Sequence, residues 1–246
     1  MSTLVYEVRE HILLLTLNRP KVRNAWDPEM SIALHEAWKR FVADDELWVC
    51  VVTGAGPMFS AGLDLKNPPK DQAPRAMPNL SVPCDKPILV AVEGAAIGYA
   101  SVFCMLADMV FAGESAYFLY PEARMGRFQG MMGGFPGRIQ YKAGLQWLMT
   151  AEPMAARRAV EVGLANEVTP DGQALTRALE VAARIADNAP LVTQAMKALA
   201  MSTVTKGPME SNFRINQLIA GIFASQDGQE GFAAFRERRK AQFKGK

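Results

Sequence analysis

Two glycine-bearing turns follow short apolar runs of this chain. The first turn lies at residues 54–65 and the second at residues 93–101. In each, an apolar run gives way to small residues and then to a turn or helix, an arrangement that leaves backbone N–H groups free at a terminus with partial positive charge. Such N–H groups suit an anionic oxygen, although either turn taken alone is more often only a tight connection.

A single acidic side chain, Glu122, follows the pair Tyr120 and Pro121. The preceding residues Phe118 and Leu119 are apolar, and burial among them would raise the pKa of the carboxyl toward neutrality, where a proton shuttle works best. The simpler interpretation is a carboxylate in the first turn of a helix, where the helix dipole stabilises negative charge.

The composition excludes several classes of protein. The chain has 246 residues, half of them apolar, which is enough for one large domain or two small ones with a sizeable core. Its 27 Lys and Arg residues nearly balance its 25 Asp and Glu residues. That balance is too even for a surface dedicated to nucleic acid, so we expect no nucleic-acid partner.

No segment of the sequence is typical of a membrane span or an export signal. The longest uncharged apolar run lies between Glu93 and Asp108 and is interrupted by Gly94 and Gly98. It is shorter than the roughly 18 residues that a transmembrane helix needs. The N-terminus lacks a basic start followed by an apolar stretch, so we expect a cytoplasmic protein without a membrane partner.

Cysteine and histidine are too sparse for a disulfide framework or a metal site. The three cysteines are odd in number and widely separated, which favours reduced, buried thiols. The two histidines, His11 and His35, have no second ligand at a suitable spacing. We therefore predict no metal site and no histidine-based catalytic triad.

The elements that position these residues alternate between strands and helices. Apolar runs predict strands at residues 4–8, 12–17, 48–53, 88–92, 109–111 and 116–119. Helical spacing predicts helices from Asp27, with Pro28 in the first turn, and at residues 97–107, 154–162, 174–186, 191–201, 209–223 and 231–241. Residues 67–87 are rich in proline and predict an extended loop. The order favours an α/β fold with parallel strands and a helical C-terminal third.

Six blocks of the sequence, taken in order, carry a resemblance to a known family. They are LNRPKVRNA at 17–25, VVTGAGPMFSAGLDL at 51–65, KPILVAVEGAAIGYAS at 86–101, AGESAYFLYPEARMG at 112–126, GLANEV at 163–168 and EGFAAFRERRKAQF at 230–243. In these blocks the chain resembles the crotonase superfamily, also called the enoyl-CoA hydratase/isomerase family. The resemblance implies an α/β spiral of repeated ββα units with an acyl-CoA site over residues 1–189. It further implies a C-terminal helical trimerisation region over 190–246, and hence a homotrimer or a dimer of trimers.

The resemblance also implies roles for individual residues. The backbone N–H groups of Leu63 and Tyr99 would form an oxyanion hole for the thioester enolate, and Glu122 would shuttle the proton. Main-chain groups of Ala61 would meet the adenine, Ala25 would line the path of the coenzyme, and Asp64 would hold the turn. The expected substrate-binding and coenzyme-binding positions are Ala25, Ala61, Gly62, Asp64, Gly98, Val102 and Lys240. Lys240 belongs to a basic C-terminal stretch. This stretch either reaches from one subunit to attract the coenzyme phosphates bound by its neighbour, or is a solvated tail.

The chain departs from the family pattern at two of these positions. Typical hydratases of the family use two glutamates, and Val102 stands at the first place, which leaves Glu122 alone. One carboxylate is enough to move a proton between two carbons, so we expect isomerisation of 3-enoyl-CoA to 2-enoyl-CoA. Tyr99 stands where a glycine is usual and either narrows the acyl pocket or packs in the core. Arg124, Arg127 and Gln129 are further polar candidates for that pocket.

Other chemistry stays open at this point. Hydration of 2-enoyl-CoA with a single glutamate is the nearest alternative, followed by thioester hydrolysis or a non-catalytic, acyl-CoA-binding member. Coenzyme A is implied only as part of the substrate. No metal, nicotinamide or flavin is implied, because the thioester carbonyl is itself the electron sink.

Overall fold

The computed structural model describes residues 2–127 and 130–246. Strands β1 to β9 cover Leu4–Arg9, Ile12–Leu17, Val49–Gly54, Ile88–Val92, Ala95–Ile97, Met109–Gly113, Tyr117–Leu119, Met154–Ala155 and Glu167–Thr169. Helices α1 to α9 cover Pro28–Ala43, Tyr99–Leu106, Glu122–Met125, Tyr141–Thr150, Ala156–Glu161, Ala174–Ala186, Pro190–Thr203, Pro208–Ala224 and Gln226–Glu237. Three 3₁₀ segments, η1 to η3, cover Pro20–Val22, Lys70–Ala76 and Met131–Gly137.

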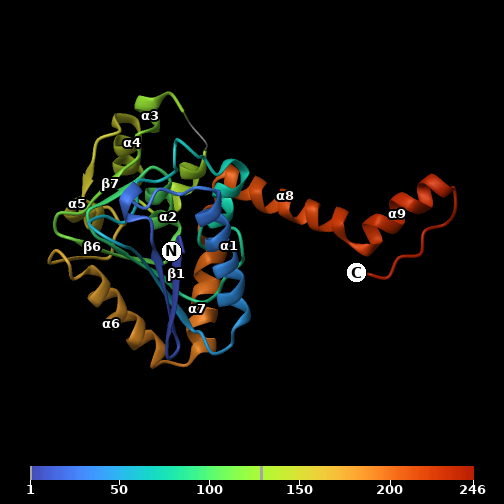
Figure 1. Ribbon diagram of the computed structural model, residues 1–246, viewed down its shortest axis with the longest axis horizontal. Coiled ribbons are helices and arrows are strands. Elements are labelled where there is room, and N and C mark those ends of the chain that lie inside the picture. Colours follow the sequence, from blue (N-terminus) through green and yellow to red (C-terminus); the bar gives the residue numbers. More distant parts are fainter. Residues whose placement is uncertain (1, 128–129) are drawn as a thin grey trace.

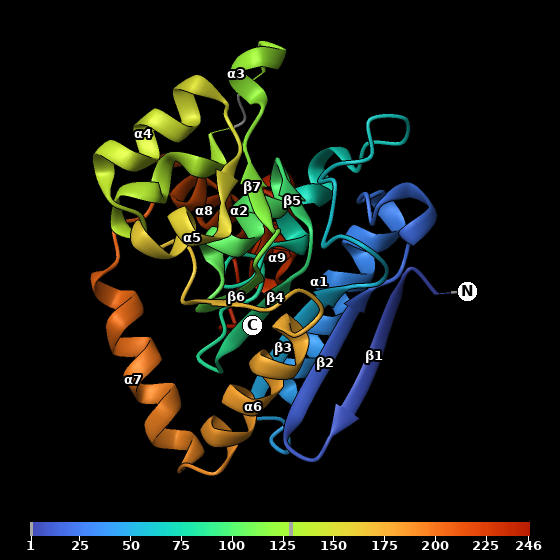
Figure 2. The same cartoon turned by 90° about the vertical axis from the view of Figure 1, so that its left-hand side faces the viewer.

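The central strands of the main sheet are buried on both faces. Its six strands lie in the order β1-β2-β3-β4-β6-β9, with β1 antiparallel to β2 and the other pairs parallel. Alternate side chains of β3 and β4 belong to two separate hydrophobic cores, and α6 contributes to one of them. Figure 2 shows α6 lying across this face of the sheet. This two-sided burial explains why these strands are continuous apolar runs in the sequence.

A second, smaller sheet carries the turns of interest. Its three strands lie in the order β5-β7-β8, and β5 and β7 are parallel. β5 and α2 follow β4 along the chain, and β7 and α3 follow β6 in the same way. These are the repeated ββα units of the expected α/β spiral (Figure 1), so the predicted fold class is confirmed.

Several predicted boundaries are wrong. The helix expected at 97–107 begins only at Tyr99, because Ala95–Ile97 pairs with β7 as a strand. The predicted loop at 67–87 contains η2, and the predicted helix at 154–162 starts with the short strand β8. The short strands β5, β8 and β9 and helix α4 were not expected, and α9 ends at Glu237 rather than at 241. Strands of two or three residues form because of the strands they pair with more than because of their own composition, so a sequence pattern does not reveal them.

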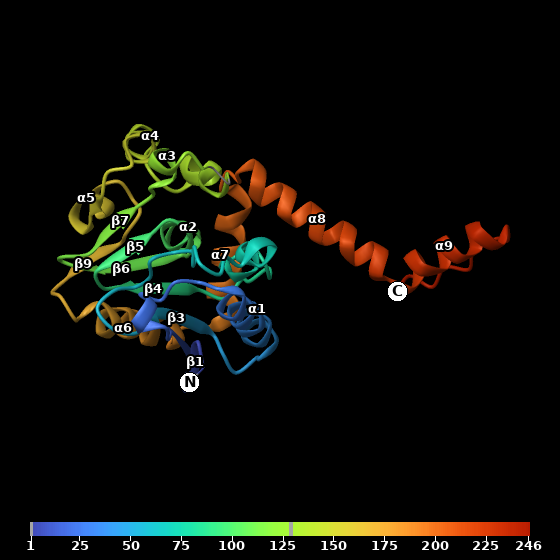
Figure 3. The ribbon, with the colours of Figure 1, turned by 45° about the horizontal axis from the view of Figure 1, so that its top comes forward.

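The C-terminal helices leave the body of the molecule. Helix α7 follows the predicted division at 189/190, which stays a prediction, and α8 with α9 forms an arm that points away from the sheets (Figures 1 and 3). The base of α8 is held by an ion pair between Arg138 Nη2 and Glu210 Oε2 at 2.9 Å. Among the described residues, no helix combines the length and apolar character that a bilayer span requires.

The core around α2 depends on one aromatic cluster. The Phe103 ring lies 5.5 Å from that of Trp26, 6.1 Å from that of Trp38 and 6.0 Å from that of Phe59, centroid to centroid. All four side chains are almost completely buried. The cluster joins α1, the first turn and α2, and it therefore fixes α2 against the other two segments.

We expect Phe103→Ala to lower the free energy of unfolding by about 3–5 kcal/mol, since it removes a buried ring and leaves a cavity. Urea unfolding followed by tryptophan fluorescence measures the change. Leu65→Ala is the control, because Leu65 is 68% exposed and its loss should have little effect. An equal effect of the two substitutions would contradict this description of the core.

Candidate active site

The two predicted turns lie side by side. Ser60 N donates to the Ala95 carbonyl at 3.1 Å, and Ile97 N donates to the Ser60 carbonyl at 3.0 Å. Gly62 has φ +82°, and a Cβ there would collide with the Ile97 carbonyl oxygen and lie 3.3 Å from Tyr99 N. Only glycine allows this approach. The turn after β3 therefore packs directly against the start of α2.

Two backbone N–H groups are free at this junction. Within residues 2–127 and 130–246, neither Leu63 N–H nor Tyr99 N–H donates a hydrogen bond to a protein acceptor. Tyr99 is the first residue of α2, so its N–H belongs to the unpaired donors of a helix N-terminus and carries the partial positive charge found there. Two fixed donors of this kind can stabilise an oxygen that becomes negative during a reaction.

Glu122 lies next to the same N-terminus. The end of β7 is tied to α2 because Gly98 N donates to the Leu119 carbonyl at 2.7 Å and Ser101 Oγ donates to it at 3.1 Å. Glu122 follows as the first residue of α3, and a Cβ on Gly98, which has φ +55°, would lie 3.3 Å from Glu122 Oε1. Three sequence-distant groups, Leu63 N–H, Tyr99 N–H and the Glu122 carboxyl, are thus brought together.

The Glu122 carboxyl is poised to exchange a proton near neutral pH. Its Oε2 is buried and has no hydrogen-bond partner among the described residues. Burial raises the pKa of Glu122 to about 7, and a hydrogen bond from its own backbone N–H only partly offsets that rise. A carboxyl with this pKa gives up and takes back a proton with little free-energy cost, which general acid–base chemistry requires.

Arg19 links the first turn to the segment before α1. Its guanidinium pairs with Asp27 at 3.1 Å and with Asp64 at 3.2 Å, and it also donates to the Ala25 carbonyl. Desolvation alone would raise the pKa of Asp64, but hydrogen bonds from Lys66 N, Asn67 N and the Arg19 guanidinium outweigh it and lower that pKa. Asp64 therefore stays charged and holds its own turn.

Asn24 and Ser60, which were not predicted as site residues, hold the backbone of the first turn in place. The buried Asn24 Nδ2 donates to the carbonyls of Ala55, Met58 and Phe59 at 2.8, 3.0 and 3.1 Å. Ser60 Oγ donates to the Asn24 carbonyl at 2.8 Å and accepts from Gly62 N at 3.0 Å. The signal was present in the LNRPKVRNA block, where Asn is a residue type that tolerates the left-handed backbone found at this position, φ +52°.

Ala25 and Ala61, two of the predicted coenzyme-binding residues, have main-chain groups already in use. Ala25 offers its carbonyl to Arg19. Ala61 N–H donates to the Arg23 carbonyl at 2.9 Å, so the group that remains for a ligand is the Ala61 carbonyl, which accepts no bond from a described residue. Val102 is fully buried in α2 and presents no polar group.

Other predicted residues lie away from the Leu63, Tyr99 and Glu122 groups. Lys240 follows α9, which ends at Glu237. Helix α9 lies in the arm, distant from α3 in Figures 1 and 3, and a role of Lys240 in a neighbouring subunit stays a prediction. Arg124 and Arg127 are exposed, and Arg124 donates to the Thr150 carbonyl at 3.4 Å. Gln129 lies outside the described residues.

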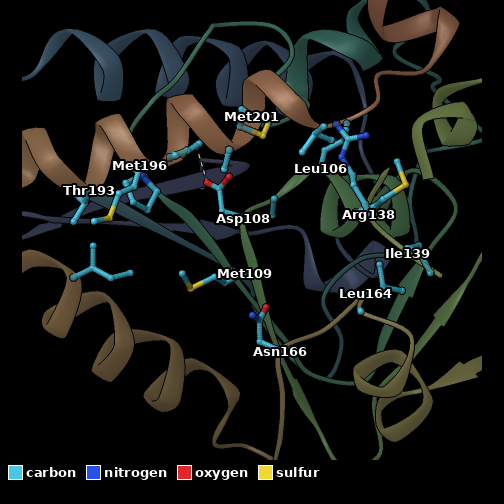
Figure 4. A pocket seen from close by; sticks show the side chains of 18 residues that line it. Leu106, Asp108, Met109, Arg138, Ile139, Leu164, Asn166, Thr193, Met196 and Met201 are labelled. Atoms are coloured by element: carbon cyan, nitrogen blue, oxygen red, sulfur yellow. Dashed lines mark ion pairs between the residues drawn. The ribbon is translucent and has the colours of Figure 1, made fainter. Parts of the chain in front are cut away.

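A cavity of about 540 Å³ lies elsewhere, between α7 and the ends of α2 and β6. Figure 4 shows Asp108, Met109, Met196 and Met201 around it, with the ion pair between Asp108 and Lys197 at 2.6 Å. Its lining includes neither oxyanion donor nor Glu122, so it is not the site described above. Across the described part of the chain, no three His, Cys, Asp or Glu side chains gather to form a metal site.

We expect Glu122→Gln to stabilise the protein at alkaline pH. The pKa of Glu122 is about 7 in the folded state against 4.5 for an ordinary glutamate, so ionisation between these values favours unfolding as pH rises. Relative to the variant, the wild type should lose roughly 1–2 kcal/mol from about pH 5 to about pH 8, less than the full shift implies because solvent screens a half-buried group. Thermal unfolding at both pH values tests this, and an unchanged difference would contradict it.

Comparison with known proteins agrees with this geometry. A family model described as enoyl-CoA hydratase/isomerase matches residues 7–246. An enoyl-CoA hydratase of Mycobacterium tuberculosis is 38% identical, covering 96% of this chain and 94% of the relative. The 2,3-dehydroadipyl-CoA hydratase of Escherichia coli is 31% identical over the full length of both chains.

Solved structures show the same likeness. The crystal structure of a carnitinyl-CoA hydratase from Mycobacterium avium superposes with a TM-score of 0.77 at 34% identity, covering all of both chains. The names of these relatives are those of hydratases, and they give the predicted isomerase preference no support. On the family model, the identities and the shared fold together, the chain belongs to the enoyl-CoA hydratase/isomerase family of the crotonase superfamily and processes acyl-CoA.

Proposed function

We propose that this chain adds water reversibly to a 2-enoyl-CoA thioester, with Glu122 as the group that exchanges the proton. The observation that supports it most strongly is the half-buried Glu122 carboxyl, whose Oε2 is buried without a partner among the described residues, beside the free N–H groups of Leu63 and Tyr99. A proton donor next to an oxyanion hole suits a reaction that passes through a thioester enolate.

The proposed step balances with these groups alone. The water oxygen bonds to C3 while one water proton passes to the Glu122 carboxylate. The C2=C3 electron pair moves toward the thioester carbonyl, whose oxygen becomes an enolate held by the N–H groups of Leu63 and Tyr99. The proton then passes from Glu122 to C2, which restores the carboxylate and gives a 3-hydroxyacyl-CoA. Each backbone donor contributes about 3–4 kcal/mol in reactions of this type.

The names of the relatives favour hydration among the reactions that share this enolate. The relatives described above are named as hydratases. Carnitinyl-CoA dehydratases of Salmonella, whose name states the reverse reaction, are 33% identical with 96% of this chain covered. We transfer to this chain only the class of substrate, a 2-enoyl thioester of coenzyme A. The shape of the acyl group is left to experiment.

Isomerisation of 3-enoyl-CoA to 2-enoyl-CoA is the second candidate, and one observation favours it. Val102 is apolar and fully buried, so α2 places no second carboxyl at that position, and the Glu122 carboxyl lies beside Gly98 at the N-terminus of α2. In that reaction Glu122 would take a proton from C2 of the 3-enoyl thioester and return it to C4. The same oxyanion hole would hold the enolate.

We expect Glu122→Gln to lower turnover by about 10²- to 10⁴-fold, because the amide cannot exchange the proton. The measurement is mass spectrometry after incubation of trans-2-hexenoyl-CoA, and separately trans-3-hexenoyl-CoA, in heavy water. Addition of one heavy-water molecule to the 2-enoyl thioester, lost in the variant, is the expected result. A moved double bond without added water would establish the isomerase instead. Unchanged thioesters would overturn both candidates and favour a binding protein or a hydrolase acting on other acyl groups.

We further propose that the arm packs against other copies of the chain, as a homotrimer or a dimer of trimers. Apolar side chains lie exposed along it, namely Ile215, Leu218, Ile222, Phe232 and Phe235. A single chain leaves this apolar surface in water, which soluble proteins generally avoid. Light scattering should give three or six times 26.9 kDa, and a stable monomer would contradict the proposal.

A further inference from the structure

Glu122 and the oxyanion donor Tyr99 N–H belong to different elements of the fold. Tyr99 is the first residue of α2, and Glu122 is the first residue of α3, which follows β7. Proton transfer to a bound enolate depends steeply on the geometry of the two groups, and a displacement of about 1 Å can cost about a hundredfold in rate. The contacts that hold the end of β7 against α2 therefore affect the proposed reaction directly.

The Ser101 hydroxyl joins α2 to two strands of the smaller sheet. Its side chain is fully buried, two residues after Tyr99. Ser101 Oγ donates to the Ala96 carbonyl of β5 at 2.7 Å and to the Leu119 carbonyl at the end of β7 at 3.1 Å. The hydroxyl has a single proton, so the two carbonyls share it. A buried hydroxyl destabilises the fold unless it is bonded, and here both acceptors lie on strands that lead to the site.

The Leu119 carbonyl accepts two bonds from the first turn of α2. Gly98 N donates to it at 2.7 Å, and Ser101 Oγ is the second donor. These two donors lie on either side of Tyr99 in the sequence. The main-chain bond alone would leave the end of β7 free to rotate about it, and the side-chain bond removes that freedom. The end of β7 is therefore fixed against the turn that carries the oxyanion donor.

Helix α4 holds the same strand from another side chain. Trp147 Nε1 donates to the Phe118 carbonyl at 3.2 Å, and the Trp147 side chain is only 4% exposed. The Tyr120 ring packs 6.5 Å from that of Trp147, centroid to centroid. Phe118 and Leu119 are consecutive residues of β7, so two helices, α4 and α2, restrain neighbouring carbonyls of this strand.

The link from β7 to Glu122 is short and stiff. Only Tyr120 and Pro121 separate Leu119 from Glu122. Tyr120 is 3% exposed, and the ring of Pro121 fixes its own φ, here −84°. A shift of the Leu119 carbonyl is therefore passed on to the Glu122 carboxyl instead of being absorbed by the connecting residues.

We propose that Ser101 and Trp147 are positioning residues for Glu122, and that together they set the separation of its carboxyl from Tyr99 N–H. This inference rests on the proposed function, in which Glu122 exchanges the proton. Neither side chain gains or loses a proton, and both act through the position of β7. Their role is the same for hydration and for isomerisation, because each reaction passes a proton between Glu122 and an enolate held at Tyr99 N–H.

The test uses Ser101→Ala and Trp147→Phe, each of which removes one donor to a β7 carbonyl. Thr169→Val is the matched control, since the buried Thr169 Oγ1 donates to the Ala112 carbonyl of the main sheet at 3.4 Å. Two activities are measured: hydration of trans-2-hexenoyl-CoA, and exchange of the C2 hydrogen of hexanoyl-CoA with heavy water. Exchange needs Glu122 and the oxyanion hole but no added water. Thermal unfolding confirms that each variant is folded at the assay temperature.

We expect Ser101→Ala to lower kcat for hydration and the rate of C2 exchange by a similar factor, about ten- to hundredfold, with KM changed less than about twofold. The backbone donors still bind the thioester in this variant, whereas the Glu122 carboxyl is displaced from it. Trp147→Phe should lower both rates in the same way. Thr169→Val should leave both rates close to those of the wild type.

Double variants separate positioning from general damage to the fold. If Ser101 acts through Glu122, Ser101→Ala should have little further effect on either rate in a Glu122→Gln background. A full additional loss in that background would overturn the positioning role. So would an unchanged kcat in both single variants, an effect on KM alone, or an equal loss of activity in Thr169→Val.

The two activities also distinguish this inference from the proposed function. If the wild type exchanges the C2 hydrogen but hydrates no 2-enoyl thioester, the proposed hydration is overturned, and the exchange rates alone decide the role of Ser101 and Trp147. Absence of both activities overturns the positioning role together with the proposed function.

Discussion

The close approach of Gly62 to the Ile97 carbonyl is the constraint on which the site depends. It brings the turn after β3 against the start of α2, and with it the two free N–H groups of Leu63 and Tyr99. Neither turn does this alone, because each supplies one donor. The parallel register of β3 and β4 carries both turns to the same edge of the sheet, which is where open α/β sheets commonly bind their ligands.

A set of polar contacts keeps this approach from relaxing. Asn24 satisfies three carbonyls of the first turn, and Arg19 joins Asp27, the N-cap of α1, to Asp64 within that turn. Glu122, by contrast, is left with one carboxyl oxygen unpaired in the described part of the chain. Burial raises the pKa of Glu122 toward neutrality, and no bond to Oε2 from a described residue offsets that rise.

The sequence predicted the parts that depend on local patterns. Strand β4 and helix α6 have the predicted bounds, and Asp27 caps α1 as expected through Met30 N at 2.9 Å. Strand β5 was not predicted: its first two residues fall in the predicted turn and Ile97 in the predicted helix, because three apolar residues carry no period of their own. The members of the site were named through family resemblance. Their meeting, the unpaired Oε2 of Glu122 and the bracing by Asn24 depend on contacts across the chain that no local pattern contains.

The central claim is that the thioester oxygen binds between Leu63 N–H and Tyr99 N–H, opposite Glu122. A crystal structure of the protein with hexanoyl-CoA tests it most directly. We predict that the thioester oxygen lies about 2.7–3.1 Å from both nitrogen atoms, with C2 facing the Glu122 carboxyl. A thioester oxygen bonded to neither nitrogen, or a C2 turned away from Glu122, would contradict it.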